Sequence, residues 1–367
     1  MGICDSSNNT RKPQKKAINK SSNKDKTKTN STTHATLSNK NNSQGENDDY
    51  IIPTTLARRD DINKYYKLDS EILGQGASGT VCIGEKDGEK FAIKRINKMS
   101  IKSKLSIIKE AEFSKLKHPN IIEYFDIFED LKTISFVMEL GEGGDLFDFI
   151  VNSPIGHLPL DLTIDLMVQI MSTIDYLHNT EHIVHRDIKP ENFMITIDPG
   201  DKAIVKLIDF GMSTHFPPKG KYLTEYLGTP NYAAPEIISH LGYNEKVDIW
   251  AIGVLLFNMM TGYEPFRGES RSELDDEIKF KQINFELLEN EQLRDFCEKL
   301  LTRNVKERIG AKEGLEIIKK IKEEREELYR KEEEEERNGV EQDEINKDRE
   351  DYNTFWSAFA GRIGMGV

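Results

Sequence analysis

The stretch from His185 to Asn192, which reads HRDIKPEN, constrains this chain more than any other feature. It sets Asp187, Lys189 and Asn192 at fixed offsets in one short loop, and Asp209-Phe210-Gly211 follows seventeen positions after Asn192. A triplet such as His-Arg-Asp occurs by chance on solvated loops, but the whole octet followed by Asp-Phe-Gly is far more specific. The sequence therefore predicts a catalytic loop that meets a second carboxylate at one site.

These residue types suit phosphoryl transfer, in which catalysis is mostly positioning and charge neutralisation. Asp187 is expected to accept or orient the proton of the attacking hydroxyl, and Lys189 to offset charge on the moving phosphoryl group. Asn192 and Asp209 carry the hard oxygen ligands that Mg²⁺ prefers. The pattern predicts ATP and Mg²⁺ as cofactors.

The octet and the Asp-Phe-Gly triplet resemble those of eukaryotic protein kinases, over roughly Tyr66 to Ala311. The resemblance implies an α+β, two-lobed kinase fold with a small β-rich N-lobe and a large α-helical C-lobe. The core is most similar to the calcium/calmodulin-dependent and calcium-dependent serine/threonine kinases, and Arg308-Ile309-Gly310 is similar to the cyclic-nucleotide-dependent group. The sequence has no EF-hand calcium loop, so direct calcium binding is not expected.

We expect four regions along the chain. Residues 1–64 are predicted to be a disordered, basic, acylated tether, residues 65–141 the N-lobe, residues 142–315 the C-lobe, and residues 316–367 a charged extension, either helical or disordered.

Glycines in a G-x-G-x-x-G-x-V pattern lie between two strand-like runs, where they let the backbone close over phosphates. This pattern alone also fits a dinucleotide-binding fold, but no helix follows it, and Phe91-Ala92-Ile93-Lys94 arrives on the next apolar strand. The resemblance makes Lys94 the lysine that pairs with ATP, with Val81, Ala92 and Met194 around the adenine. The loop consists of Leu73, Gly74, Gln75, Gly76, Ala77, Ser78, Gly79, Thr80 and Val81.

A helix around residues 103–116 is expected to supply the glutamate that fixes Lys94. Counting back from His118-Pro119 in the family's usual register gives Lys109, whereas a one-residue deletion gives Glu110. We choose Glu110, because an active site needs the carboxylate. The Lys109 register is the alternative, and it would favour a weakly active or inactive kinase-fold scaffold.

The run from Ile134 to Gly141 is typical of a buried strand that enters a hinge. The resemblance implies that Met138 stands behind the adenine and that backbone groups of Glu139 and Gly141 bind its edge. Asp145 would reach the ribose and face an incoming peptide, or would cap a helix, and the two roles are compatible.

The activation segment runs from Asp209 to Glu236. The pairing of Lys189 with Thr229 is that of serine/threonine rather than tyrosine kinases. Glu225 stands where many kinases of this broad group need a phosphothreonine, and its fixed carboxylate can pair with Arg186 without a phosphate. We therefore expect activity without phosphorylation of this segment.

Two further interactions implied by the resemblance are structural. Asp248 is expected to bond the catalytic-loop backbone, and Arg308 to form a buried ion pair with Glu236. For substrate choice, the acidic Asp145 and Glu191 lie where the family reads basic residues, although Asn258 replaces a further acid of strongly basophilic members. A preference for Arg or Lys about three residues before the acceptor, and a weaker one two before it, is expected.

The two ends of the chain differ in charge and composition from the middle. Residues 1–40 hold nine Lys or Arg against two Asp or Glu, whereas residues 320–351 hold eight against fifteen. From Ser6 to about Asp49 there are too few apolar side chains to offset the entropy of ordering, which predicts a tether. This tether has no interleaved aromatics or arginines for base stacking, so nucleic-acid binding is not expected.

The first six residues, MGICDS, fit an N-myristoylation pattern with Gly2 as the acceptor. Because one acyl chain binds membrane only marginally, palmitoylation of Cys4 or the basic stretch from Arg11 to Lys28 would supply the second signal. The alternative is an unmodified start with Cys4 as an incidental thiol.

No run is long and apolar enough for a spanning helix, and no signal-peptide core is present. The three cysteines are too scattered for a disulfide framework. The predicted location is therefore the cytoplasmic face of a membrane, held by lipid. The expected partners are protein substrates and membrane lipid, with the chain itself a monomer.

An apolar cluster, Phe355-Trp356-Ser357-Ala358-Phe359, stands isolated among polar residues near the end of the chain. It either docks onto a lobe or recruits a partner, and the sequence leaves both open. The preceding run from Lys319 to Arg337 is rich in glutamate and reads as a solvated helix or a disordered segment.

Overall fold

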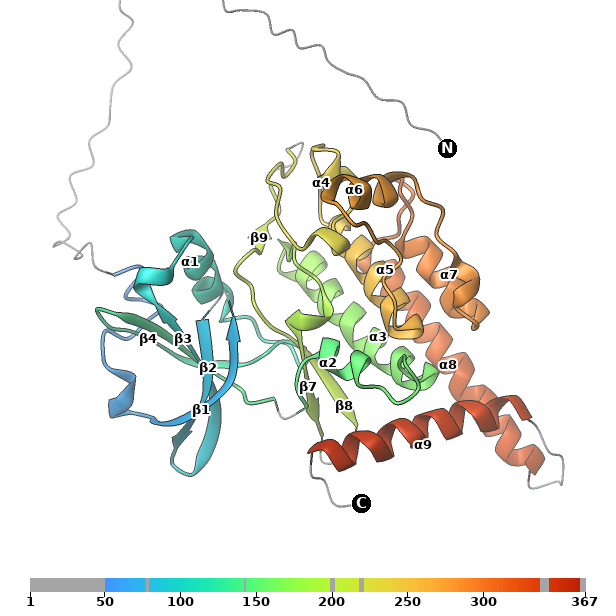
Figure 1. Ribbon diagram of the computed structural model, residues 1–367, viewed down its shortest axis with the longest axis horizontal. Helices are drawn as coiled ribbons and strands as arrows, with labels where there is room; N and C mark the ends of the chain where they lie inside the picture. Colours follow the sequence, from blue (N-terminus) through green and yellow to red (C-terminus); the bar gives the residue numbers. More distant parts are fainter. Residues whose placement is uncertain are drawn as a thin grey trace, which may run out of the picture. The chain divides into compact units, whose positions relative to one another are not determined.

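The computed structural model describes residues 50–76, 79–141, 143–198, 202–217, 221–336 and 343–363. Four residues with expected roles, Gly2, Cys4, Ala77 and Ser78, lie outside these ranges. The described chain has a small lobe built on a β-sheet and a large helical lobe (Figure 1). This confirms the predicted α+β, two-lobed arrangement.

A five-stranded antiparallel sheet in the order β1-β2-β3-β5-β4 forms the small lobe. The central strand β3 is buried along most of its length, with Phe91, Ala92, Ile93 and Lys94 all buried in a row. Its register sets Ala92 opposite Met138 and Lys94 opposite Phe136. The elements are β1 (Lys67–Gly76), β2 (Gly79–Lys86), β3 (Glu89–Asn97), α1 (Lys104–Phe113), β4 (Tyr124–Glu129) and β5 (Thr133–Met138), with 3-10 turns at Ile62–Lys64 and Lys98–Ser100.

The small lobe begins earlier than predicted. Residues 50–64 were expected to belong to a disordered tether, but Ile52 and Ala57 are buried. Arg58 also bonds to β4, its N–H donating to the carbonyl of Ile127 (2.8 Å) and its carbonyl accepting from Glu129 N–H (2.9 Å). The expectation was wrong because this segment's few apolar residues have no helix or strand period, and their burial depends on a distant strand.

The large lobe is organised around α3 and α5, whose inward side chains are almost fully buried. Helix α3 packs against α5, α8 and β8. Helix α3 runs from Leu160 to Asp175 and continues as a π-helical turn at Tyr176–Thr180. The remaining elements are α2 (Leu146–Val151), α3 (Leu160–Asp175), β6 (Ile183–Val184), β7 (Phe193–Ile197), β8 (Ala203–Leu207), β9 (Thr214–His215), α4 (Pro235–Ile238), α5 (Lys246–Thr261), α6 (Arg271–Phe280), α7 (Glu291–Leu300), α8 (Ala311–Glu336) and α9 (Asp343–Ile363), with 3-10 turns at Pro190–Asn192, Pro230–Tyr232 and Phe285–Leu287.

The C-terminal aromatic cluster docks onto the large lobe. In Figure 1, α9 runs back from the end of α8 toward α2 and β7. The rings of Phe355 and Phe359 stand edge-to-face against Phe149 of α2, with centroids 4.9 and 4.8 Å apart. Arg325 of α8 bonds both Asp161 of α3 and Asp348 of α9. Burial of these aromatic rings explains why the cluster packs on the lobe.

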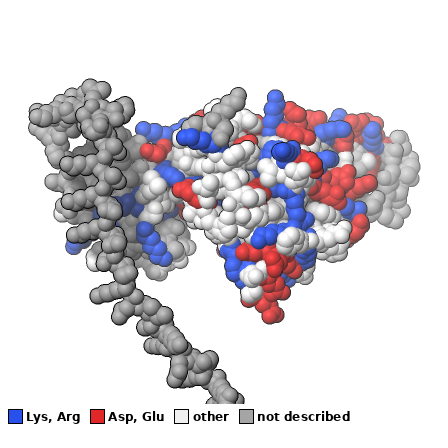
Figure 2. All heavy atoms as spheres, turned by 90° about the horizontal axis from the view of Figure 1, so that it is seen from above, with Lys and Arg blue, Asp and Glu red and all other residues white. Residues whose placement is uncertain are grey.

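The described surface carries both signs of charge. On the face drawn in Figure 2, Lys and Arg side chains are interspersed with Asp and Glu side chains. None of the helices in the described ranges combines the length with the apolar composition needed to cross a bilayer.

Arg308 and Glu236 form the buried ion pair that the resemblance implied. Arg308 Nη1 donates to Glu236 Oε1 at 2.7 Å, and Nη2 donates to Oε2 at 3.1 Å. Arg308 Nε donates to the carbonyl of Thr302. Removing one partner would leave the other charge buried and unpaired.

We predict that Arg308→Ala lowers the free energy of unfolding by about 3–5 kcal/mol. Urea denaturation followed by tryptophan fluorescence measures this change. The control is Arg330→Ala, because Arg330 is exposed on α8 and its replacement should alter stability by less than about 0.5 kcal/mol. Equal effects of the two substitutions would contradict the prediction.

Candidate active site

The catalytic loop is held by one buried carboxylate, that of Asp248 in α5. Its two oxygens accept the backbone N–H groups of His185 and Arg186, each at 2.8 Å, and His178 Nε2 lies 2.9 Å away. Burial by itself raises the pKa of Asp248, but the hydrogen bonds from His178 and from the Arg186 backbone help to lower it overall. The ionised carboxylate therefore stays available to hold the loop.

Arg186 needs this support because its backbone is left-handed, with φ 71°. Such a conformation costs a non-glycine residue about 1–3 kcal/mol and persists only where the surroundings fix it. Here the Asp248 hydrogen bond fixes the backbone, and Arg186 Nε donates to the carbonyl of Met212 at 2.7 Å. The turn presents the next residue, Asp187, to the site.

Asp187 is fixed by three other predicted residues. Its Oδ1 accepts the N–H (3.0 Å) and the hydroxyl (2.8 Å) of Thr229. Asn192 Nδ2 donates to Asp187 Oδ2 at 2.9 Å, and Lys189 Nζ lies 3.3 Å from the same oxygen. Lys189 Nζ also donates to Thr229 Oγ1 at 3.0 Å. These contacts hold the Asp187 carboxylate in one orientation. A general base that accepts a proton from a hydroxyl needs such a fixed orientation.

Asn192 and Asp209 have the chemistry expected of ligands for a divalent cation. Asn192 Nδ2 also donates to the carbonyl of Asp187 at 2.7 Å, so both its hydrogens are used and its side-chain oxygen is left to bind a metal. Burial alone raises the pKa of Asp209, but the charge of Lys94 and the N–H of Gly211 lower it overall. An amide oxygen and an ionised carboxylate suit a hard cation such as Mg²⁺.

Lys94 pairs with Glu110 rather than with any group at position 109. Its Nζ lies 2.7 Å from Glu110 Oε1 and 3.9 Å from Asp209 Oδ2. Burial by itself lowers the pKa of Lys94, but the charges of Glu110 and Asp209 outweigh burial and raise it. The helix therefore has the register chosen from the sequence. Lys109 instead lies near the activation segment, where burial and the charge of Arg186 lower its pKa.

The residues expected around the adenine come together at the base of the sheet. Ala92 lies between Ile83 and Met138 in the β2-β3-β5 register, and Val81 lies opposite Lys94. The hinge then passes close to β7, because a Cβ added at Gly141 would meet Met194 Cγ at 2.1 Å. Gly79 belongs to the glycine-rich loop and has a φ of 129°. A Cβ atom at this position would lie 2.5 Å from the carbonyl oxygen of Arg95, so only glycine fits there.

Asp145 caps a helix, which was one of its two expected roles. Its Oδ1 accepts the N–H of Asp148 in the first turn of α2, at 2.8 Å, and its backbone bridges to Met194. Burial raises the pKa of this carboxyl. The cap holds Asp145 beside the hinge and β7.

The activation segment is tied to the catalytic loop through Glu225. Arg186 Nη1 donates to Glu225 Oε2 at 2.5 Å, and its guanidinium is almost fully buried, whereas 58% of the Glu225 side chain is exposed. The hydrogen bond from Arg186 lowers the pKa of Glu225. Strand β9 of the segment also pairs with β6, directly before the catalytic loop.

Two residues at the site were missed by sequence reasoning. The hydroxyl of Tyr243 donates to the carbonyl of Glu225 at 2.8 Å and contacts Arg186. Glu264, in the connection after α5, accepts from Asn231 at 2.6 Å, and its charge acts with that of Glu191 on Tyr232. Neither residue belongs to a periodic pattern, and only tertiary contacts identify them.

Asn258, which the sequence analysis considered for substrate choice, is buried in α5.

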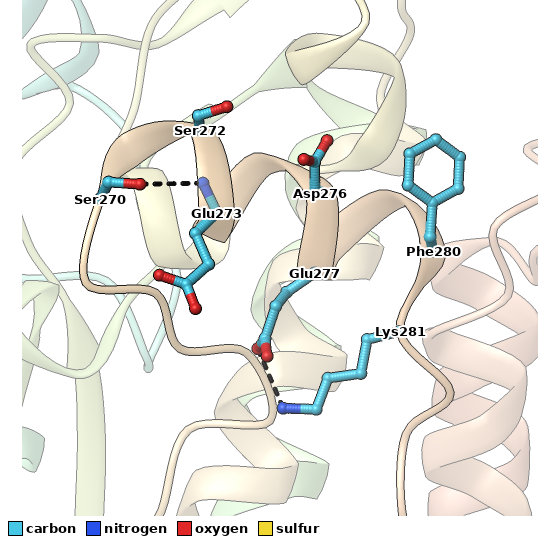
Figure 3. Close-up of a pocket in the computed structure, with 7 residues that line it drawn as sticks. All are labelled: Ser270, Ser272, Glu273, Asp276, Glu277, Phe280 and Lys281. Carbon is cyan, nitrogen blue, oxygen red and sulfur yellow. Dashed lines mark hydrogen bonds and ion pairs between the residues drawn. The ribbon is translucent and has the colours of Figure 1, made fainter.

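A separate hollow of about 560 Å³ lies beside α6 (Figure 3) and contains none of these groups. Its polar residues stabilise the helix itself. Ser270 caps the first turn by accepting the N–H of Glu273, and Glu277 pairs with Lys281 at 2.9 Å and accepts the N–H of Arg267. We therefore assign these residues a structural role.

Residues 67–317 match the family model described as the protein kinase domain, which is more than half of the chain. Calcium-dependent protein kinase 3 of Plasmodium berghei (strain Anka) is 35% identical over 263 residues, 69% of this chain and 46% of that protein. Calcium-dependent protein kinase 8 of Arabidopsis thaliana is 35% identical over 267 residues, 70% of this chain and 49% of that protein. The chain spans about half the length of these two relatives.

Myosin light chain kinase A of Dictyostelium discoideum is similar over nearly its whole length. It is 34% identical over 273 residues, which are 70% of this chain and 88% of that protein.

The Arg186–Glu225 pair predicts phosphoryl transfer without phosphorylation of the activation segment. The bacterially expressed, phosphatase-treated chain should be active, and Glu225→Gln should lower kcat about tenfold because the buried guanidinium loses its charged partner. Thr224→Ala, a change at the exposed neighbour, should leave kcat unaltered. Recovery of activity only after phosphorylation would contradict this prediction.

The same pair predicts how this effect depends on pH. A lowered glutamate pKa means that the contribution of the pair is complete above the unfolded-state pKa and is lost only as the pH falls through the folded-state pKa. Both values lie well below neutrality, so the kcat ratio of wild type to Glu225→Gln should be constant between about pH 6 and 8.

Proposed function

This chain belongs to the protein kinase family, and from that premise we propose that it transfers the γ-phosphoryl group of ATP to serine or threonine side chains of proteins. The observation that most strongly supports this function is the ion pair between Lys94 and Glu110, whose charged atoms lie 2.7 Å apart. Family members need this ion pair to hold ATP for catalysis. The alternative, a weakly active or inactive scaffold, depended on the Lys109 register and loses its support.

Each step of the proposed transfer has its own side chain. Asp187, oriented by Thr229 and Asn192, accepts the proton of the attacking hydroxyl. Lys189 lies beside that carboxylate and offsets charge on the transferred group. When bound, Mg²⁺ neutralises charge on the phosphates, and the side-chain oxygens of Asn192 and Asp209 would hold it.

We propose that the preferred substrates carry basic residues ahead of the acceptor. Glu191 is exposed within the catalytic loop, and its charge and that of Glu264 act on the same tyrosine, Tyr232. Two carboxylates close together favour an arginine or lysine of an incoming peptide. Thr229, bonded to both Lys189 and Asp187, favours serine or threonine as the acceptor.

Asp187→Asn should test the activity directly. It keeps the hydrogen bonds that an amide can make but cannot accept the substrate proton, so kcat should fall by about 10²–10⁴-fold. The assay is phosphate transfer from radiolabelled ATP to a serine peptide with arginine three positions before the acceptor. A matched peptide with glutamate at that position should have a much higher KM. An inactive wild-type chain with intact ATP binding would favour the scaffold.

Attachment to a membrane stays a prediction of the sequence pattern, since Gly2 and Cys4 lie outside the described residues. The pattern supports myristoylation of Gly2 and palmitoylation of Cys4. Gly2→Ala should abolish incorporation of a myristate label and move the chain from the membrane to the soluble fraction. Cys4→Ser should keep the myristate label yet weaken membrane retention, because one acyl chain binds only marginally. Unchanged fractionation of both variants would contradict the prediction.

A further inference from the structure

The segment from Tyr50 to Arg59, which we call the strap, is clamped onto the small lobe by one buried carboxylate. Glu129, at the end of β4, has 0% of its side chain exposed. Its oxygens accept the backbone N–H groups of Ile51 (2.6 Å) and Ile52 (2.9 Å). Arg59 forms an ion pair with the same carboxylate, as does Lys98 at 2.8 Å.

The clamp stays charged because these donors outweigh burial. Burial by itself raises the pKa of Glu129, but the hydrogen bonds from Lys98 and from the strap backbone lower it overall. The ring of Tyr50 lies under the cations of Arg59 (4.2 Å) and Lys98 (4.8 Å). The polar contacts therefore fix both ends of the strap, and a strap that left would take Arg59 and two backbone N–H donors away from the buried carboxylate, leaving it with Lys98.

The apolar side of the strap packs into the core that supports α1. Ile52 is 1% exposed and Ala57 is 7% exposed, and both belong to the same buried cluster as Ile107 and Ala111 of α1. The cluster also contains Phe136 of β5, which lies opposite Lys94 in the sheet. One continuous core thus runs from the strap to the catalytic lysine and helix.

Ile107 and Ala111 flank Glu110 along α1, three residues before it and one after it. Helix α1 has only ten residues, and helices this short depend on tertiary packing rather than on intrinsic propensity. Ser103 caps its first turn. The buried cluster consequently decides where α1 lies, and with it the distance from Glu110 to Lys94.

We propose that the strap is a positioning element of the catalytic site, which holds α1 so that Glu110 meets Lys94. The strap touches no reacting group and acts through α1. This inference rests on the proposed kinase function, because Glu110 and Lys94 are the groups that it serves. Loss of the strap lets α1 move away, which should lower kcat more than it raises the KM of the peptide substrate.

Two isoleucines in the same lobe provide a matched test in the full-length chain. Ile52 and Ile62 are both 1% exposed, but Ile62 belongs to a different cluster, with Tyr66 and Phe128. Ile→Ala removes the same apolar surface at both positions, so both variants should lose thermal stability. Ile52→Ala should lower kcat about tenfold, whereas Ile62→Ala should change it less than about twofold.

Rescue with a peptide separates positioning from a general loss of structure. A synthetic peptide of residues 47–61, added at about 1 mM to match the effective concentration of a short tether, should restore kcat to the Ile52→Ala variant. The same peptide with Ile52→Asp should not restore it. Hydrogen exchange of the α1 amides should be faster in Ile52→Ala than in Ile62→Ala and should slow again when the wild-type peptide is added.

The inference is overturned if both alanine variants lose kcat by the same factor, or if the peptide fails to restore kcat to Ile52→Ala. It is also overturned if Ile52→Ala frees the strap, as seen by exchange, yet keeps the wild-type rate of α1 exchange. An inactive wild-type chain would count against the proposed function alone, because the exchange measurements still decide whether the strap positions α1.

Discussion

The buried carboxylate of Asp248 is the interaction on which the site depends. It binds two successive N–H groups of the catalytic loop and so sustains the left-handed turn at Arg186. That turn sets Asp187 toward Thr229 and aims the Arg186 side chain at Glu225. One carboxylate therefore fixes both the proton acceptor and the ion pair that orders the activation segment, and it does so from inside the most buried helix of the large lobe.

Sequence reasoning predicted most of this site because short motifs carry its chemistry. Asp187, Lys189 and Asn192 lie within six consecutive residues of one loop, so their spacing in the sequence already determines that their side chains meet. The pairing of Lys94 with Glu110 was harder to predict, since one residue of register separates a carboxylate from Lys109. Glu110 was chosen because an active site needs a carboxylate beside this lysine.

The parts that sequence reasoning missed depend on contacts between distant segments. Nothing near Ile52 signals burial, because its polar partner is the Glu129 carboxylate, 77 residues away. Tyr243 and Glu264 likewise gain meaning only once α5 brings their loops to the catalytic loop. The aromatic run at Phe355 was conspicuous, yet its docking site on Phe149 could not be read from the sequence.

Helix α1 connects these features, because neighbouring residues on it point in different directions. Glu110 faces the catalytic lysine, Lys109 lies near the Arg186–Glu225 pair, and Ile107 joins the core under the strap. Glu225 carries a permanent charge, so its contact needs no phosphate to form. Control of catalysis through α1 must then come from its other supports. Of these, the strap is held by the Glu129 carboxylate, by the backbone of Arg58 on β4 and by the burial of Ile52 and Ala57, so a change at any of these contacts would reach α1 through the core that they share.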